Sequence, residues 1–517
     1  MKKLNFAYLI GFGESLRGYI IMKFKKLSVF LFLLIIVLLM ACSRKLSLKE
    51  EVFQFKQPVI KGEEIEVGNF INPYITKESL DKGSLNGDLE DQDNGYRILT
   101  SEKIIEDIDI LFERLKTTYG AYIAFGGEPK FEEAKKDILS EIGTNRIEAK
   151  DLLGIIKNNL DFVNDCHFLI GGERLKKITP TKLASNLEFE KVKGSYRLKN
   201  NDSNMNIKDY EEYIKPSIDE DGNITYKLFY KDNGKDNSPD LNWKSLDNIN
   251  HGDNIEPEYG EVDSIPVLKI KNFYHIDHYK DYYNFVINKA KDLSKSEYGI
   301  LDLRGNGGGN AILVDEWIKA YSGNSGRLSG DMVFYINLEE SKTTGRGQST
   351  DQIIEYINSM GMKKYDENHY FGVGSDETFE KEGTLFVLID GESASASEHM
   401  IDILRHYNNT IFVGVPSKGM MISSSSTGTV LPNSRISFYW GNMYINLEPK
   451  YFKEFYGFEP DIWVEPVNAE ERVLKLIENI RNKTKTGGRF GCLKTSETSP
   501  CLPLSLIDIK YFHILKS

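Results

Sequence analysis

The chain of 517 residues is long enough for two or three domains, and its 40% hydrophobic and 27% charged residues are typical of a globular protein. Its formal net charge is −12. Because binding to nucleic acid phosphates requires a clustered basic surface, this balance argues against nucleic acid as a partner. The cysteines form no Cys-x-x-Cys pattern, and we expect neither a metal nor a cofactor.

The N-terminal segment has the layout of an export signal. Three lysines in residues 23–26 precede an unbroken apolar run over residues 29–40, which is followed by Ala41 and Cys42. A basic segment, a short apolar run and a small residue before the cleavage point are typical of a secretory signal. The run is too short to span a bilayer comfortably.

Residues 39–42 (LMAC) also resemble the bacterial lipobox, in which the cysteine is lipidated and becomes the first residue. We therefore expect residues 1–41 to comprise an upstream extension and a lipoprotein signal peptide. Met22 would be the natural start. Cys42 would then carry the lipid that anchors the protein on the extracytoplasmic face of the cell membrane. The alternative is a short membrane anchor with a chance cysteine.

The pattern of residue types changes several times along the chain. Residues 42–99 are polar and poorly periodic, whereas apolar residues recur at helical spacing from Ser101 onward. A stretch rich in Asn, Asp, Tyr and Lys with short alternating pieces follows, which predicts hairpins. We expect a tether over residues 42–99, a helical domain over 100–175, a β-rich insert over 176–264, an α/β domain over 265–482 and a tail over 483–517.

The α/β domain is predicted from alternating strands and helices. Apolar strands are expected at residues 267–270, 299–303, 384–390 and 410–415, with helices at 279–293 and 396–407. Such alternation predicts a core of largely parallel strands, in which functional groups gather at the carboxyl ends of the strands.

Two loops follow such strands directly. Residues 302–309 (DLRGNGGG) contain consecutive glycines, which bring bare N–H groups close to a ligand. The loop lacks the ending of a phosphate-binding loop and the glycine spacing of a dinucleotide fingerprint. It therefore indicates either an oxyanion hole or a tight turn, and Asp302 and Arg304 are expected to hold the loop by hydrogen bonds.

The second loop, residues 391–398 (GESASASE), places Ser395 before a helix. This serine is either an ordinary N-cap or a nucleophile at the positive end of the helix dipole.

Together the loops resemble the C-terminal processing (tail-specific) serine peptidase family. The family's Asp-Leu-Arg loop, Ser-Ala-Ser-Glu segment and two later motifs are matched in order by residues 302–309, 395–398, 414–419 (GVPSKG) and 457–461 (GFEPD). The resemblance implies a ClpP/crotonase-like α/β core of strand–helix units, preceded by the helical domain and the insert. It makes Ser395 the nucleophile. The oxyanion would be held by the amides of Ala396 and of Gly307 or Gly308.

The resemblance fails at one position, where family members carry the lysine base and this chain has Met420. A thioether cannot accept a proton from a hydroxyl, and Lys418 is expected to point elsewhere. The tricorn-like branch has an Asp-x-His motif, matched by residues 165–167 (DCH), and a glutamate matched by Glu454. This similarity implies His167 as general base and Glu454 as its orienting carboxylate.

Several alternatives remain open for these roles. His167 is otherwise a structural histidine at a helix end, and Asp165 is expected to cap a loop. The rival bases and the rival carboxylate are His275, His278, His399 and Glu448.

The expected function is a serine-type peptidase that hydrolyses peptide bonds of extracytoplasmic proteins or peptides through an acyl-enzyme on Ser395. A binding lipoprotein that kept the fold and lost catalysis is one alternative. An esterase with the same triad is another, since a fold does not fix its substrate.

Overall fold

The computed structural model describes residues 47–76, 78–79, 97–199, 206–231, 241–273, 279–335 and 350–487. The chain divides into two compact units, residues 1–54 with 483–517 and residues 55–482. In the first unit, α2 (Leu48–Phe53) starts with a capping box, in which Ser47 and Glu50 each accept a hydrogen bond from the other's amide. The predicted export signal, Cys42 and most of the predicted tail lie outside the described residues.

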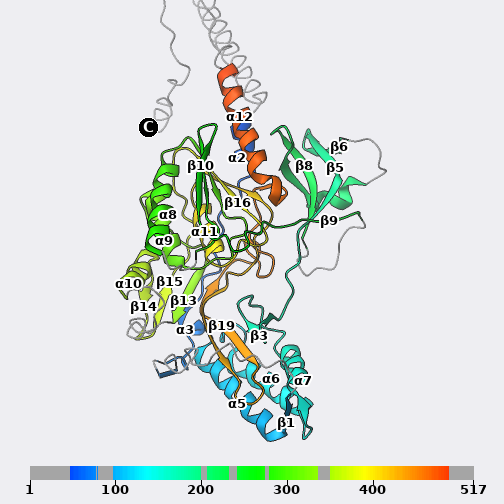
Figure 1. The fold of residues 1–517 in the computed structure, drawn as a ribbon, viewed down its shortest axis with the longest axis vertical. Coiled ribbons are helices and arrows are strands. Elements are labelled where there is room, and N and C mark those ends of the chain that lie inside the picture. Colours follow the sequence, from blue (N-terminus) through cyan, green and yellow to red (C-terminus); the bar gives the residue numbers. More distant parts are fainter. Residues whose placement is uncertain are drawn as a thin grey trace, which may run out of the picture. The chain divides into compact units, whose positions relative to one another are not determined.

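A six-stranded sheet in the order β10-β11-β12-β16-β17-β20 forms the centre of the second unit (Figure 1). All neighbouring strands are parallel except β10 and β11. Every residue of β12, β16 and β17 is buried, which explains why these strands appear as apolar runs in the sequence. The sheet confirms the predicted α/β class. Its strands are β10 (Glu258–Val262), β11 (Ile265–Lys269), β12 (Tyr298–Asp302), β16 (Thr384–Ile389), β17 (Thr410–Gly414) and β20 (Ile462–Trp463).

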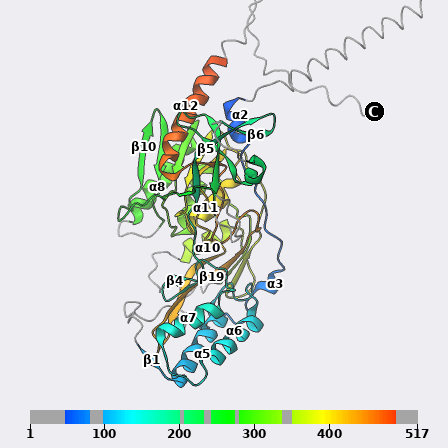
Figure 2. The same ribbon diagram turned by 90° about the vertical axis from the view of Figure 1, so that its right-hand side faces the viewer.

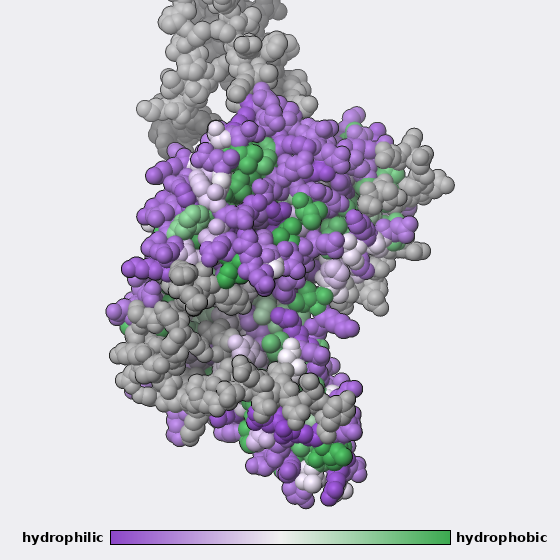
Figure 3. Space-filling model, in the orientation of Figure 1, coloured by the Kyte–Doolittle hydropathy of each residue, from purple (hydrophilic) through white to green (hydrophobic). Residues whose placement is uncertain are grey.

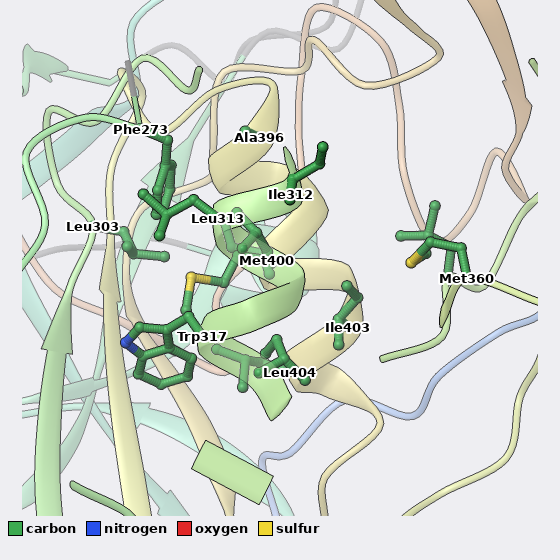
Figure 4. Close-up of a cluster of buried hydrophobic side chains, with 14 of the residues drawn as sticks. Phe273, Leu303, Ile312, Leu313, Trp317, Met360, Ala396, Met400, Ile403 and Leu404 are labelled. Carbon is green, nitrogen blue, oxygen red and sulfur yellow. The ribbon is translucent and has the colours of Figure 1, made fainter. Parts of the chain in front are cut away.

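Helix α11 (Ala396–Arg405) is buried at every residue and carries Ser395 at its N-terminus. Figure 4 shows Met400 and Leu404 of this helix beside Leu313 and Trp317 of α9. Burial of each such side chain contributes about 1.5–3 kcal/mol, so packing holds the helix and its N-terminus firmly. The helices of this core are α8 (Tyr279–Ser294), α9 (Ala311–Ser322), α10 (Thr350–Ser359) and α11. The short helices α3 (Val67–Phe70) and η3 (Pro466–Asn468) and helix α12 (Ala469–Gly487) contribute no residue to it.

A second, antiparallel sheet of seven strands has the order β14-β15-β13-β19-β3-β4, with β18 paired to β19. Its central strand β19 joins segments that are far apart in sequence, because it pairs with β13 at one end and with β3 at the other. The strands are β3 (Leu169–Ile170), β4 (Glu173–Arg174), β13 (Asp331–Tyr335), β14 (Lys363–Lys364), β15 (His369–Gly372), β18 (Ser423–Val430) and β19 (Ser437–Asn446).

Helices α5 (Ser101–Thr118), α6 (Gly127–Ile142) and α7 (Ala149–Asn159) lie beside β19 in Figures 1 and 2. Their apolar faces share one core with Phe438 and Trp440 of β19. The two-stranded pair β1 (Ile98–Leu99) and β2 (Ile147–Glu148) completes this region. The helical region and the second sheet are therefore packed together through the β18–β19 hairpin.

The insert contains a five-stranded antiparallel sheet in the order β6-β5-β8-β7, with β9 paired to β5. It has a small hydrophobic core of its own around Phe189 and Leu228. Its elements are β5 (Lys182–Val192), β6 (Ser195–Leu198), η1 (Ile207–Tyr213), β7 (Ile214–Ile218), β8 (Ile224–Tyr230) and β9 (Lys244–Ser245).

The surface drawn in Figure 3 is mainly hydrophilic, with hydrophobic residues in separate small patches. In the part of the chain that the structure describes, no helix combines the length and apolar character needed to cross a bilayer.

Candidate active site

Ser395 lies in the turn between β16 and α11, at the N-cap position of the helix. Its φ angle is 53°, in the left-handed region that non-glycine residues seldom occupy. Its amide donates a hydrogen bond to Glu398 Oε2 at 3.1 Å, and the residue is partly exposed. Such a turn, which presents a hydroxyl at a helix N-terminus, is a geometry known for catalytic nucleophiles.

The glycine loop, residues 302–309, lies directly against this turn. A Cβ atom added to Gly308 would lie 2.7 Å from Ala394 O and 2.8 Å from Ser395 Cβ, and the φ angle of Gly308 is 102°. Asn306 joins the two loops, because its carbonyl oxygen accepts hydrogen bonds from Ala394 N at 3.0 Å and from Ser397 Oγ at 2.8 Å. The two loops singled out in the sequence therefore form one structure.

The loop offers amides for an oxyanion. The amide of Gly308 already donates to Asn306 Oδ1 at 2.9 Å. In the described chain, no acceptor is hydrogen-bonded to the amides of Gly307 and Ala396. Because an oxyanion hole needs free donors beside the nucleophile, this geometry favours Gly307 over Gly308 as the partner of Ala396.

His167 reaches Ser395 from the segment before β3. Its Nε2 lies 3.2 Å from Ser395 Oγ, although the two residues are far apart in sequence. The amide of His167 donates to Asp165 Oδ1 at 2.8 Å, which fixes the backbone as expected for a loop cap. The other ring nitrogen, Nδ1, is buried and has no hydrogen-bond partner within the described residues.

Glu454 lies next to this histidine. Its Oε1 accepts a hydrogen bond from Cys166 N at 2.8 Å, and its Oε2 accepts the amides of Met421 and Ile422 at 3.2 and 3.3 Å. Among the described residues, no hydrogen bond joins His167 to Glu454. The two side chains are close to each other, but the orienting hydrogen bond that was expected is not formed.

Asp165 completes a buried cluster with these two residues. One ligand atom of each of Asp165, His167 and Glu454 lies within 4.8 Å of the others. Asp165 also accepts hydrogen bonds from Tyr119 Oη at 2.8 Å and from Ser423 Oγ at 3.1 Å. The spacing would suit a metal ion. However, the carboxylate oxygens already accept protein donors, which favours their role as partners of an imidazole.

Burial controls the protonation of the cluster. Desolvation, and then the charge of Arg174, lower the pKa of His167 to about 3. Desolvation, and then the charge of Asp165, raise the pKa of Glu454 well above its ordinary value, and desolvation also raises that of Asp165. The histidine is therefore neutral and able to accept a proton, and the two carboxyl groups resist carrying two charges at once.

A serine beside a histidine, a facing glycine loop and buried carboxylates are the groups that acyl transfer to a serine requires. Residues 264–464 match peptidase family S41. The match includes Ser395, the glycine loop and Glu454. His167 lies outside it, and its place in the site comes from the geometry alone.

The chain also resembles solved structures at low identity. They include mature CPAF, at 10% identity over 76% of this chain and 99% of that chain, with a TM-score of 0.40. A lipoprotein from Streptococcus agalactiae has 13% identity over 74% and 97%, with a TM-score of 0.35. The photosystem II D1 C-terminal processing protease has 12% identity over 71% and 94%, with a TM-score of 0.34. Among curated proteins, no sequence matches this chain.

Within the residues that match peptidase family S41, the position expected for a lysine base holds Met420. Its amide donates to Glu398 Oε2 at 2.7 Å. Lys418 points to Glu392, with Nζ and Oε2 2.5 Å apart, as the sequence spacing predicted. Neither residue supplies a base to Ser395.

The residues considered as alternative bases or as the alternative carboxylate make other contacts or lie outside the described residues. His399 is buried, with its Nε2 3.4 Å from Tyr356 Oη, and desolvation lowers its pKa to about 4. Glu448 Oε1 accepts the amide of Lys450 at 3.4 Å, within its own turn. His275 and His278 lie outside the described residues.

Asp302 and Arg304 form a buried pair beside the glycine loop. Arg304 Nε donates to Asp302 Oδ1 at 2.8 Å, and Nη2 lies 2.5 Å from Oδ2. These contacts agree with the structural role expected for both residues.

Sequence reasoning gave no role to Glu398, yet this buried carboxylate connects the loops around Ser395. In addition to the amides of Ser395 and Met420, it accepts hydrogen bonds from Ser417 Oγ at 2.6 Å and from Gly419 N at 2.7 Å. Its position three residues after Ser395 in the capping-box pattern was the available signal.

Proposed function

We propose that the chain is a serine peptidase in which Ser395 is the nucleophile, His167 the general base and Glu454 the carboxylate partner of His167. The observation that carries this proposal is the 3.2 Å separation of His167 Nε2 and Ser395 Oγ. The match of residues 264–464 to a peptidase family supports it.

The acylation step follows from this arrangement. His167 Nε2 takes the proton of Ser395 Oγ as the oxygen attacks the carbonyl carbon of the scissile bond. The amides of Ala396 and Gly307 hold the oxyanion that forms. The carboxylate cluster of Glu454 and Asp165 stabilises the imidazolium, whose positive charge offsets the repulsion between the two carboxyl groups.

The cycle closes through the same residues. The imidazolium of His167 gives its proton to the leaving amine, the C–N bond breaks, and an ester remains on Ser395. His167 then takes a proton from a water molecule that attacks this ester; the bond between the acyl carbon and Ser395 Oγ breaks, and His167 returns the proton to Oγ as the acid product leaves. No further reactant is needed.

We assign the enzyme to the tricorn-like branch, with residues 165–167 as its Asp-x-His motif. We also propose that it is exported and held on the outer face of the membrane by a lipid on Cys42. Residues 23–42 support this location through their signal and lipobox pattern. Its substrates would be proteins or peptides outside the cytoplasm.

A binding lipoprotein without catalysis is the second candidate, and the replacement of the family's lysine by Met420 favours it. A fluorophosphonate probe separates the candidates, because it reacts with an activated serine. We expect labelling of Ser395 in the folded protein and none in the Ser395→Ala variant. Absence of labelling in the folded wild-type protein would refute the peptidase proposal.

The choice of base is tested with two matched variants. We expect His167→Ala to lower kcat on the order of 10⁴-fold or more, whereas Met420→Ala keeps most of the activity. The opposite ranking would refute His167 as the base. Parallel assays with peptide and ester substrates separate a peptidase from an esterase that uses the same triad.

A further inference from the structure

Arg174, at the end of β4, contacts the segment that carries His167 and the segment that carries Met420. Its Nε donates a hydrogen bond to Cys166 O at 3.1 Å, one residue before His167. Its Nη2 lies 3.7 Å from Met420 Sδ. β4 is the edge strand of the second sheet and pairs with β3, which separates it from β19; Figure 2 shows β4 in this part of the molecule.

The two residues that contact this guanidinium, Cys166 and Met420, are each connected to Ser395 through one further residue. His167, which follows Cys166, contacts Ser395 Oγ through Nε2. The amide of Met420 donates to Glu398 Oε2, and the amide of Ser395 donates to the same oxygen. Arg174 is therefore a cation at the edge of the catalytic centre.

The charge of Arg174 is not matched by a carboxylate of the described chain. Its two hydrogen-bond partners are a carbonyl and a thioether. The adjacent Glu173 is paired with Lys157 at 2.6 Å, and Glu398 and Glu454 accept backbone amides. Guanidinium has several N–H donors in a planar fork that suits a carboxylate. The side chain is partly exposed, so its unused donors are accessible.

We propose that Arg174 binds a carboxylate of the peptide substrate close to the scissile bond. The proposal rests on the proposed function and gives the enzyme a preference for peptides that carry a negative charge there. The carboxylate comes either from an acidic side chain or from the free end of the peptide. A charge-assisted bond of this kind predicts roughly 10- to 100-fold discrimination against a neutral isostere.

The test uses two series of peptides with purified protein. In the first, each residue on either side of the cleaved bond is glutamate or glutamine. In the second, the same peptide ends in a carboxylate or an amide. We expect kcat/KM to be at least tenfold higher for the charged member of a pair at one or more positions. Which series discriminates identifies the source of the carboxylate.

Three variants decide whether Arg174 is the cause. Arg174→Met should abolish the discrimination, and Arg174→Glu should reverse it in favour of the uncharged member of the pair. The control Lys176→Met removes an exposed cation that is hydrogen-bonded to Asn164 and should leave the discrimination intact. A purely structural Arg174 predicts an equal loss for both members of every pair.

Equal losses, or wild-type protein that does not discriminate, would overturn the proposal for Arg174 while the peptidase proposal stands. If wild-type protein cleaves no peptide and Ser395 takes up no fluorophosphonate, both proposals fail together.

Discussion

At the residue scale, burial sets the protonation range of the proposed base. The pKa of His167 is lowered to about 3, mainly by desolvation and further by Arg174. A lowered pKa keeps the neutral, base-competent form populated at pH values where an exposed histidine is already charged. The imidazole is therefore ready to act over a wide acidic range.

This gives a prediction for the pH profile. We expect kcat/KM for an uncharged peptide to stay constant as the pH falls through 6.5 and to decline only well below it. A series of initial rates in buffers of constant ionic strength measures the profile, because kcat/KM reports the free enzyme. A midpoint near 6.5 would mean that the base is exposed, contrary to the position of His167.

The same shift affects stability. Below pH 6.5 the unfolded chain binds a proton at this histidine, whereas the folded chain does not. Stability from the neutral His167 is thus present above 6.5 and is lost as the pH falls toward the folded pKa of about 3. The acidic limb of activity should accordingly be distinguished from unfolding by circular dichroism at each pH.

Single residues also mark how far sequence reasoning reaches. Ser395 and His167 were chosen from motifs, and the structure brings them within 3.2 Å. The contacts of Asn306 and Glu398 were not foreseen, because they join side chains to backbone groups that are distant in sequence. No local periodicity encodes such contacts, which arise only when the loops approach one another.

At the element scale, the insert contacts the loops around the proposed site at two places. Lys231, directly after β8, is 5% exposed. Its Nζ donates to Ser417 O at 2.8 Å and to Tyr456 O at 2.6 Å. On the return path, Asn248 Oδ1 accepts the amide of Gly391 at 3.0 Å. The insert thus supports the turns that carry Met420 and Glu454.

We expect Lys231→Met to lower kcat about 10- to 100-fold with a smaller change in KM, because two carbonyl groups lose a charged donor and the turns shift. Steady-state kinetics at a temperature well below unfolding measure the effect. Lys244→Met, which changes an exposed lysine of β9, is the matched control and should behave as wild type. An unchanged kcat in Lys231→Met would show that the insert does not position the site.

Elements differ in how well their sequences reveal them. The parallel strands β12, β16 and β17 were predicted because full burial makes each a continuous apolar run. The β18–β19 hairpin was missed, since β18 begins with four serines and reads as a loop. Its strand character comes from pairing with β19, which in turn depends on β13 and β3. Tertiary pairing, not local propensity, determines it.

At the scale of the whole molecule, the proposed lipid on Cys42 decides where the peptidase acts. The net charge of −12 gives the protein no general attraction to anionic lipid surfaces. If Cys42 carries the proposed lipid, membrane binding depends on the acyl chains, and more than one chain is needed for a stable anchor. The second unit, residues 55–482, contains the complete proposed site.

We therefore expect Cys42→Ser to abolish incorporation of a fatty-acid analogue and to move the protein from the membrane fraction to the soluble fraction. The specific activity per labelled Ser395 should be unchanged, because the anchor takes no part in the chemistry. Cys166→Ser is the control: this cysteine is buried and free, so the variant should keep both the lipid label and the membrane location. If the Cys42→Ser variant stays in washed membranes and the wild-type protein takes up no lipid label, the lipid anchor is refuted. The anchor would then be the apolar run over residues 29–40, inserted into the membrane.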